Sequence, residues 1–590
     1  MTKSRDIADS TKTLDVDGGT IKLDGNYPTG TENVALGDTA LDSVQSGGNY
    51  NVAIGDKSLT DNTTGDQNTA VGRVSLTNNT TGGNNVAIGG DALFTNTTGG
   101  NNVAVGKDSL SLNTTASNNT AVGYQSLYTN TTGTANAAVG VDALKENTTG
   151  SGNSAFGSHQ VGVQNAALKK NTTGAHNSAF GVGALTNNTT ASDNTAVGMN
   201  AAKNNTTGTD VVAVGKSALE SNTTGVGNVA IGRYTLAANT TANGNTAVGG
   251  YDGSAQPALR YNTTGNANTA MGSGALSSNT TASNNTAVGY QSLYTNTTGA
   301  QNVAIGMYGL FSTTTGVNNF AGGYNALASN TTGGSNIAIG HRTLQSGVSA
   351  HNNTAIGFNA GKYCTSDANT LIGSQAGDAL VSGNVNTAVG FQALTSATTA
   401  VGNTIVGNEA GFKITTGEGN VMIGRYAGYF NGSTTTAGTT TGSNVVCIGA
   451  YSYPSSATVD SEFTLGNNSI TNLRCNDTSI SSLSDQRDKT NIVGVPLGLA
   501  FINTLRPVSF DWDRRDGSYE GKKDFGFIAQ ELKTAQEATD YSDHMRLVNE
   551  ENPDRLEADP MKTYPVMVKA IQELSTALDA ALARIATLEG

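Results

Sequence analysis

A short pattern, N-x-A-x-G, recurs through most of this chain and constrains its fold more than any other feature. The closing glycine appears 25 times between Gly37 and Gly466, and 19 of the 24 spacings are 17 residues. The leading asparagine is kept in 22 of the 25 copies, so polar and small positions repeat together. A fixed period of this kind is typical of a solenoid, in which each repeat is one unit stacked on the next.

The residue types in the repeat favour strands and turns. A full unit, Asn85 to Asn101, reads NVAIGGDALFTNTTGGN. Its β-branched residues share one face of a strand, with Ala and Gly on the other. We expect a turn at N-T-T-G, where Asn and Gly tolerate left-handed backbone, and a short second strand near A-L. Seventeen residues are too few for a helix-containing repeat and suit one coil of a β-roll.

The two faces of the strand bear on assembly. The Ala/Gly face is flat and suits close approach by another backbone, which leads to the hypothesis that three chains pack around an axis. Proline is nearly excluded, since only Pro257 lies between Pro28 and Pro454. Proline has no backbone N–H, so a hydrogen-bond ladder that uses every backbone N–H excludes it. Stacked Asn and Thr hydrogen bonds, rather than glycosylation, account for the many N-T-T triplets.

Three insertions interrupt the period, at residues 158–167, 251–258 and 425–443. The first two enter just before the A-L element and should bulge from the same edge of the roll. Insertions in solenoids map to loops and often to binding faces, so these are candidates for receptor contact. The alternative is that the insertions are tolerated by the fold and have no binding role.

Composition changes sharply near residue 484. About 30 % of the residues after this point are charged, against about 9 % before it, which marks a domain boundary. We predict an N-terminal cap or attachment segment at 1–32, a β-roll rod at 33–466, a linker at 467–483 and a separate domain at 484–590. The predicted fold is mainly β, a long trimeric β-solenoid followed by a small α+β domain ending in a coiled-coil helix.

Charge and composition exclude several classes of function. The net charge of −13 leaves no basic patch for nucleic acid. Three widely separated cysteines, Cys364, Cys447 and Cys475, imply neither a disulfide framework nor a metal site. No run of 18 apolar residues and no apolar leader are seen, so we expect no membrane insertion and assembly in a reducing cytoplasm. No cofactor is expected.

The C-terminal segment has ordinary globular features. It holds the single tryptophan, Trp512, in the strand-like run PVSFDW, and then DFGFIAQEL, which enters a helix. Its end repeats apolar residues at three- and four-residue spacings, as in a short coiled coil, and this pattern is compatible with a trimer. The repeated residues are Tyr564, Met567, Ile571, Leu574, Leu578, Ala581, Ile585 and Leu588.

Two resemblances to known families follow from these motifs. The tandem N-x-A-x-G coils resemble the head repeats of trimeric autotransporter adhesins, which are β-rolls packed as trimers. The ordered motifs SDQRDK, LRPVSFDW, GFIAQEL and KAIQEL closely resemble the endosialidase-type intramolecular chaperone at the C-terminus of phage tailspikes and tail fibres. That resemblance runs through 484–590 and implies a domain that assists trimerisation and then cuts itself off.

The resemblance to the chaperone assigns roles to individual residues. It implies Ser484 as nucleophile and Lys489 as base, with cleavage between Leu483 and Ser484. Asp485 and Arg487 match the motif and would position the loop. Without the resemblance, a serine and a lysine five residues apart would indicate only a polar linker.

The sequence therefore predicts a virion structural protein: a homotrimeric tail fibre or appendage for host attachment. Its expected partners are virion baseplate or tail proteins and a host cell-surface receptor, a glycan or an outer-membrane component. Its expected location is the virion, after assembly in the host cytoplasm. The only enzymatic activity expected is self-cleavage. The alternatives are a bacterial surface adhesin and a glycan-degrading tailspike with a site between subunits.

Overall fold

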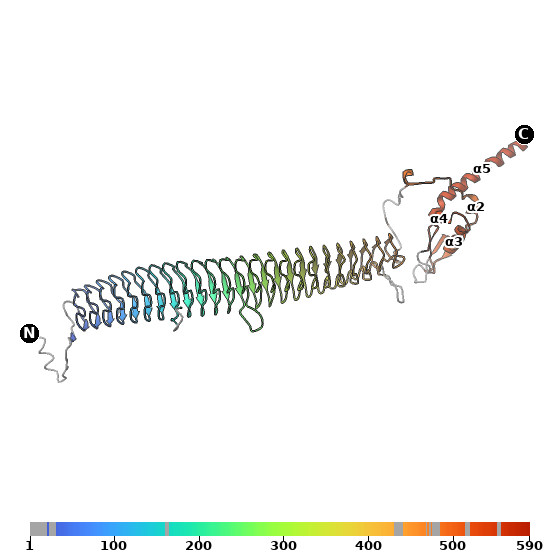
Figure 1. Ribbon diagram of the computed structural model, residues 1–590. Helices are drawn as coiled ribbons and strands as arrows, with labels where there is room; N and C mark the ends of the chain where they lie inside the picture. Colours follow the sequence, from blue (N-terminus) through green and yellow to red (C-terminus); the bar gives the residue numbers. More distant parts are fainter. Residues whose placement is uncertain are drawn as a thin grey trace, which may run out of the picture. The chain divides into compact units, whose positions relative to one another are not determined.

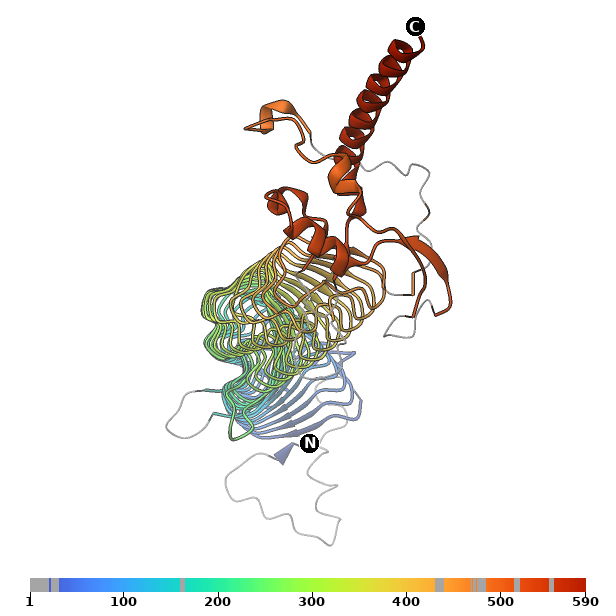
Figure 2. The same ribbon diagram turned by 90° about the vertical axis from the view of Figure 1, so that its right-hand side faces the viewer.

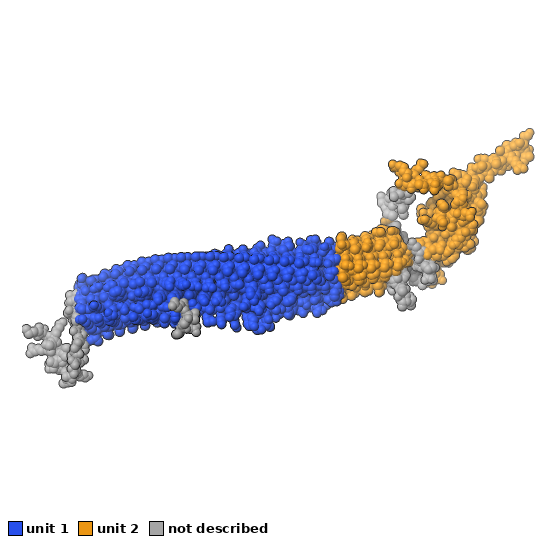
Figure 3. Space-filling view, in the orientation of Figure 1, with its two compact units in different colours: residues 1–368 blue, residues 369–590 orange. Residues whose placement is uncertain are grey.

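The computed structural model describes residues 21–22, 31–159, 165–429, 440–467, 469–470, 474, 484–513, 520–550 and 556–590. The chain divides into two compact units, residues 1–368 and 369–590, which are coloured separately in Figure 3. Within the described ranges, no helix has the length and apolar character needed to cross a membrane.

The first unit is a stack of coils, each contributing one three-residue strand to a parallel sheet (Figure 1). Neighbouring strands pair in register, so that Ala87 is paired to both Ala70 and Ala104. The short β1 (Ile21–Lys22) pairs antiparallel with β2. The coil strands are β2 (Val34–Leu36), β3 (Val52–Ile54), β4 (Thr69–Val71), β5 (Val86–Ile88), β6 (Val103–Val105), β7 (Thr120–Val122), β8 (Ala137–Val139), β9 (Ser154–Phe156), β10 (Ser178–Phe180), β11 (Thr195–Val197), β12 (Val212–Val214), β13 (Val229–Ile231), β14 (Thr246–Val248), β15 (Thr269–Met271), β16 (Thr286–Val288), β17 (Val303–Ile305), β18 (Phe320–Gly322), β19 (Ile337–Ile339) and β20 (Thr354–Ile356).

The second unit contains further coils of the same kind and a small α+β domain. Its coil strands are β21 (Thr370–Ile372), β22 (Thr387–Val389), β23 (Thr404–Val406), β24 (Val421–Ile423), β25 (Val446–Ile448) and β26 (Phe463–Leu465). The small domain contains η1 (Gln486–Asp488), α2 (Leu499–Ile502), β27 (Val508–Asp511), β28 (Lys523–Gly526), α3 (Ala529–Glu537), α4 (Ser542–Met545), β29 (Val548–Asn549), β30 (Glu557–Ala558), η2 (Pro560–Thr563) and α5 (Tyr564–Glu589). The predicted mainly β fold, a solenoid of 17-residue repeats followed by an α+β domain, is confirmed.

The central residue of the coil strands, an alanine in most of them, points into the coil. Ala87 and Ala104 have no exposed surface, whereas Ile88, on the opposite face, is 40 % exposed. The prediction that the flat Ala/Gly face meets another chain is therefore wrong. A 17-residue coil is so narrow that its own turns fill the space beside the alanine, and the Val/Ile face is the one left outside.

The A-L element forms a turn, so the predicted second strand is also wrong. In the coil of β5, Asp91 and Leu93 adopt left-handed backbone with φ of 57° and 51°. Because left-handed residues alternate with right-handed ones, the backbone turns here and directs the side chain of Leu93 into the core, where it is fully buried. The peptide groups still bond from coil to coil, since the N–H of Leu93 donates to the Ser109 carbonyl at 3.0 Å.

The leading asparagine of the repeat forms a buried ladder. The side-chain oxygen of Asn68 accepts hydrogen bonds from the backbone N–H and side-chain amide of Asn85, at 3.0 and 3.1 Å. The amide of Asn85 also donates to the Gly99 carbonyl at 2.9 Å, and Asn85 in turn accepts from the backbone N–H of Asn102 at 3.0 Å. Each asparagine thus pairs polar groups that the core would otherwise leave unsatisfied.

The asparagine of N-T-T forms a second ladder. Asn96 donates to Asn79 at 2.8 Å and to the Gly99 carbonyl at 2.9 Å, and the hydroxyl of Thr97 donates to the Thr114 carbonyl at 3.0 Å. Both asparagines are fully buried. Stacked hydrogen bonding, as predicted, is the role of these triplets in the folded chain.

The closing glycine is required by the spacing of the coils. Gly89 has φ of +133°, and a Cβ placed there would lie 2.6 Å from the carbonyl of Gly106 in the next coil. A side chain at this position would push two coils apart and break the ladder.

In several coils of the second unit, the large buried side chain comes from the strand instead of from the turn. Strands β21 and β24 have Leu371 and Met422 in place of the central alanine, and both are fully buried. In these coils the left-handed leucine is replaced by Gly377 and Gly428, with φ of 58° and 74°. A Cβ on Gly377 would lie 2.9 Å from Leu371. The large residue has moved from the turn to the strand, and the packing requirement is unchanged.

The C-terminal domain has a separate apolar core. Phe501, Leu532, Leu547 and Val566 are buried together, with β27 and β28 forming an antiparallel hairpin. The carboxylate of Glu573 on α5 accepts the N–H of Leu499 at 2.8 Å and so caps α2. The first turns of α5 therefore belong to this core.

The rest of α5 extends away from the other elements of the domain (Figure 2). Its apolar residues beyond Glu573 are exposed, among them Leu578 at 58 % and Leu588 at 81 %. Residues 1–32 and 467–483 lie mostly outside the described residues, and the predicted domain boundaries stay predictions.

Removing one member of the asparagine ladder should destabilise the solenoid. Asn85→Ala deletes the amide that bonds to Asn68 and Gly99, and it leaves the N–H of Asn102 without its acceptor. We expect a loss of about 2–4 kcal/mol, because buried polar groups lose their partners. Thermal unfolding followed by circular dichroism measures this loss. Thr81→Ala, at an exposed turn position, is the matched control and should change stability by about 0.5 kcal/mol or less; equal effects would contradict the ladder's role.

Candidate functional site

Ser484 and Lys489 come together around one tight turn. Asp485 begins this turn, η1, by accepting the backbone N–H of Arg487 on its side chain at 2.9 Å. The turn closes when the N–H of Lys489 donates to the Gln486 carbonyl at 3.2 Å. A polar residue before a helical turn commonly caps it in this way, and this explains why five residues bring the two ends together.

The side chains of the pair are in direct contact. Lys489 Nζ donates to Ser484 Oγ at 2.5 Å and lies 3.3 Å from the Ser484 carbonyl oxygen. Both residues are exposed. A hydroxyl bonded to an amine is the arrangement in which a neutral lysine can take the serine proton.

Asp485 and Arg487 pair with each other rather than with Lys489. Arg487 Nε lies 3.1 and 3.0 Å from the two carboxylate oxygens, and its terminal nitrogen lies 2.5 Å from Oδ2. This hydrogen bonding lowers the pKa of Asp485 and raises the pKa of Arg487. Arg487 forms the ion pair with the Asp485 carboxylate, and the side chain of Lys489 bonds to Ser484 instead.

The structure thus brings together four of the predicted site residues in two pairs, Ser484 with Lys489 and Asp485 with Arg487. Leu483, on the other side of the predicted cleavage site, lies outside the described residues. The arrangement places a hydroxyl beside an amine on a turn fixed by an ion pair, and all four side chains are exposed.

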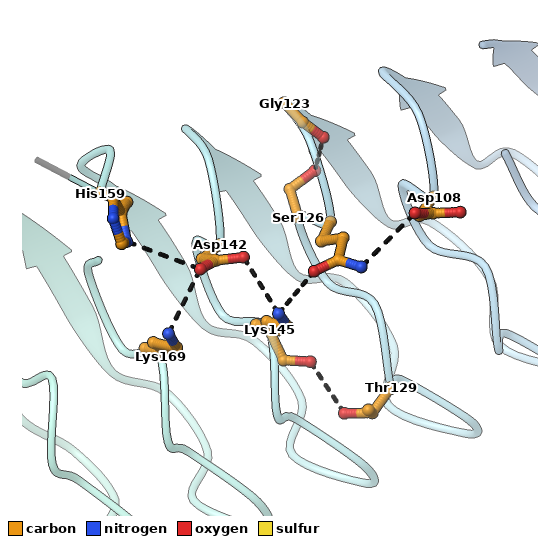
Figure 4. A network of polar contacts seen from close by, with 9 residues as sticks. Asp108, Gly123, Ser126, Thr129, Asp142, Lys145, His159 and Lys169 are labelled. Carbon is orange, nitrogen blue, oxygen red and sulfur yellow. Dashed lines mark hydrogen bonds and ion pairs between the residues drawn. The ribbon is translucent and has the colours of Figure 1, made fainter. Parts of the chain in front are cut away.

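A second polar cluster lies beside the first insertion (Figure 4). Asp142, largely buried, contacts Lys145 at 3.3 Å, Lys169 at 3.2 Å and His159 at 3.7 Å. Lys145 also donates to Gln125 at 2.5 Å. The carboxylate pairs with both lysines, so this cluster fixes adjoining coils in place. Across the described part of the chain, no group of three or more His, Cys, Asp or Glu side chains is placed to hold a metal ion.

The β-solenoid, followed by a small α+β domain with a Ser–Lys pair at its start, fits a fibre-type protein. Residues 484–541 match the family described as chaperone of endosialidase. The match begins at Ser484 and includes Lys489 but ends before α5, so the predicted resemblance is borne out over 484–541. The family implies formation of a trimer. No curated protein matches the chain.

The Asp485–Arg487 pair should persist below the ordinary pKa of an aspartate. The folded pKa of Asp485 is depressed, so the pairing is complete above the ordinary Asp value of 3.8 and is lost as pH falls through the lower folded pKa. A carboxyl-carbon NMR titration of aspartate-labelled protein, assigned with Asp485→Asn, should give a midpoint below 3.8. Arg487→Gln should return that midpoint toward the ordinary value. A wild-type midpoint at or above it would show that the pair does not form.

Proposed function

We propose that this protein is a virion structural protein, a trimeric tail fibre or similar appendage for host attachment. Its C-terminal chaperone drives trimerisation and then releases itself by autoproteolysis. The observation that carries the proposal is the Ser484–Lys489 hydrogen bond at the very start of the segment that matches the chaperone family. Its partners are tail or baseplate proteins and a host surface receptor.

The family resemblance implies cleavage between Leu483 and Ser484, with Ser484 as the nucleophile. Neutral Lys489 takes the hydroxyl proton, and Ser484 Oγ attacks the carbonyl carbon of Leu483. The amide nitrogen of Ser484 leaves with the proton returned by the lysine, so the acyl group passes from nitrogen to oxygen as an ester. Water hydrolyses this ester to a carboxylate on Leu483 and a free amine and hydroxyl on Ser484.

The repetitive rod explains the need for a chaperone. Because successive coils are nearly identical, three chains could align in several registers shifted by one 17-residue coil. A folded trimeric nucleus at one end aligns the chains and lowers the entropic cost of the first correct pairing. After its release the rod cannot easily unfold and re-form, so it is kinetically trapped.

Two exposed apolar surfaces suit contact between three copies. One is the outward face of the coil strands, including Ile88, Ile231 and Ile305 at 40, 40 and 47 % exposed. The other is the exposed apolar stripe of α5, which has the spacing of a coiled coil. A row of partly exposed β-branched side chains on one face is typical of a surface that is buried on association.

Self-cleavage is tested by intact-mass measurement under denaturing conditions. The wild type should yield a chain ending at Leu483 and a 107-residue fragment. Ser484→Ala should abolish cleavage, and so should Lys489→Arg, which keeps the charge but cannot serve as a base. Lys533→Arg, in the same domain, is the matched control and should be cut like the wild type. A wild-type protein that is a folded trimer yet uncut would make the pair inert and the domain a permanent cap.

Trimerisation through the strand face is tested by analytical ultracentrifugation. The triple variant Ile88→Asp, Ile231→Asp, Ile305→Asp should lose the trimer, because carboxylates of three chains would be buried close together. The coil interior is untouched, so circular dichroism should still report β structure. The control places aspartate at three exposed turn threonines, Thr81, Thr224 and Thr298, and should remain trimeric. A trimeric isoleucine variant would contradict this packing.

A further inference from the structure

The second insertion builds an open hollow of about 330 Å³ on the side of the coils. Its lining residues come from two successive coils of the first unit, those of β13 and β14. The loop of residues 251–257 projects from these coils (Figure 1). The residues that line it are Arg233, Tyr234, Tyr251, Gln256, Arg260 and Tyr261.

Two guanidinium groups in the hollow lie against tyrosine rings. The guanidinium carbon of Arg233 is 4.9 Å from the ring centre of Tyr234 and 5.7 Å from that of Tyr251. That of Arg260 is 5.4 Å from the same Tyr234 ring and 5.3 Å from Tyr261. The Tyr234 ring thus contacts both guanidinium groups, so two positive charges lie close together.

These charges are not neutralised within the described part of the chain. Neither arginine forms an ion pair with a carboxylate among the described residues, and the polar contact of Arg260 is the neutral side-chain oxygen of Gln256 at 2.8 Å. By contrast, Lys145 and Lys169 beside the first insertion are neutralised, because both form ion pairs with Asp142. Arg73, at the same position after its closing glycine as Arg233, faces Asp56 at 3.8 Å.

The loop that carries Tyr251 is held in shape by its own contacts. The carboxylate of Asp252 accepts the backbone N–H groups of Ser254 and Ala255 at 2.9 and 2.7 Å. These backbone bonds lower the pKa of Asp252 to about 2, so the contacts are complete at neutral pH. A site that is already formed loses less entropy when a ligand binds.

We propose that this hollow binds an anionic saccharide, a carboxylate-bearing sugar of a cell-surface polysaccharide. The planar carboxylate matches the hydrogen-bond donors of Arg233 and Arg260. The exposed rings of Tyr251 and Tyr261 offer flat apolar surface to the C–H face of a sugar, and the Gln256 amide offers bonds to a hydroxyl. The inference adds a ligand class to the proposed host attachment, and its biological role rests on that proposed function.

The test is isothermal titration calorimetry on the purified full-length fibre, with tetragalacturonate as the probe and neutral maltotetraose as its counterpart. Binding of the acidic probe should weaken as sodium chloride rises, and the neutral sugar should not bind measurably. Arg233→Gln and Arg260→Gln should each weaken binding about ten-fold or more, since charge-assisted bonds are lost. Arg73→Gln is the matched control and should leave binding unchanged.

Several outcomes would overturn the inference. They are binding unaffected by either arginine variant, equal binding of maltotetraose, or complete displacement by an equal concentration of inorganic sulfate, which would show a general anion site. These results are independent of the proposed function. A chain that trimerises, cuts itself and attaches to cells but binds no uronate contradicts this inference alone. A chain that binds uronate yet remains uncut contradicts the autoproteolysis alone.

Discussion

The solenoid depends on one requirement, that most polar groups buried inside a coil find hydrogen-bond partners within the stack of coils. Asn85 shows this most directly, since its amide and carbonyl groups are satisfied by Asn68, Gly99 and Asn102. A buried amide without such partners would be costly, so the coils must stack in register and at constant spacing. The closing glycine and the near absence of proline follow from the same requirement, because both keep the backbone ladder continuous.

Packing inside one coil decides which surface is left for association. In most coils the small alanine of the strand is buried together with the leucine of the A-L turn, and where the strand residue is large, as Leu371 is, the turn residue becomes glycine. The interior is therefore complete within a single chain. What stays outside is the β-branched face of the strands, and a trimer of such chains would join on this face without sharing the core.

The two proposed sites lie where the repeat is interrupted. In the C-terminal domain, the turn from Ser484 to Lys489 brings together a hydroxyl and an amine, and Arg487 pairs with the Asp485 carboxylate. At the second insertion, a loop of a few residues adjoins two arginines that form no ion pair with any carboxylate of the described residues. The regular coils differ, because their buried asparagines and many of their backbone N–H groups bond to the neighbouring coils.

The sequence by itself determined the solenoid, its period and the stacked hydrogen bonding of the N-T-T triplets, because each depends on local residue type and spacing. The domain boundary near residue 484 stays a prediction. The pairing of Ser484 with Lys489 was also expected, though only through a family resemblance. The tertiary structure decided which strand face is buried, how the A-L element turns at Leu93, and that Arg233 and Arg260 share the ring of Tyr234. These features depend on coil width and on contacts between residues a coil apart, and a linear repeat pattern contains neither distance.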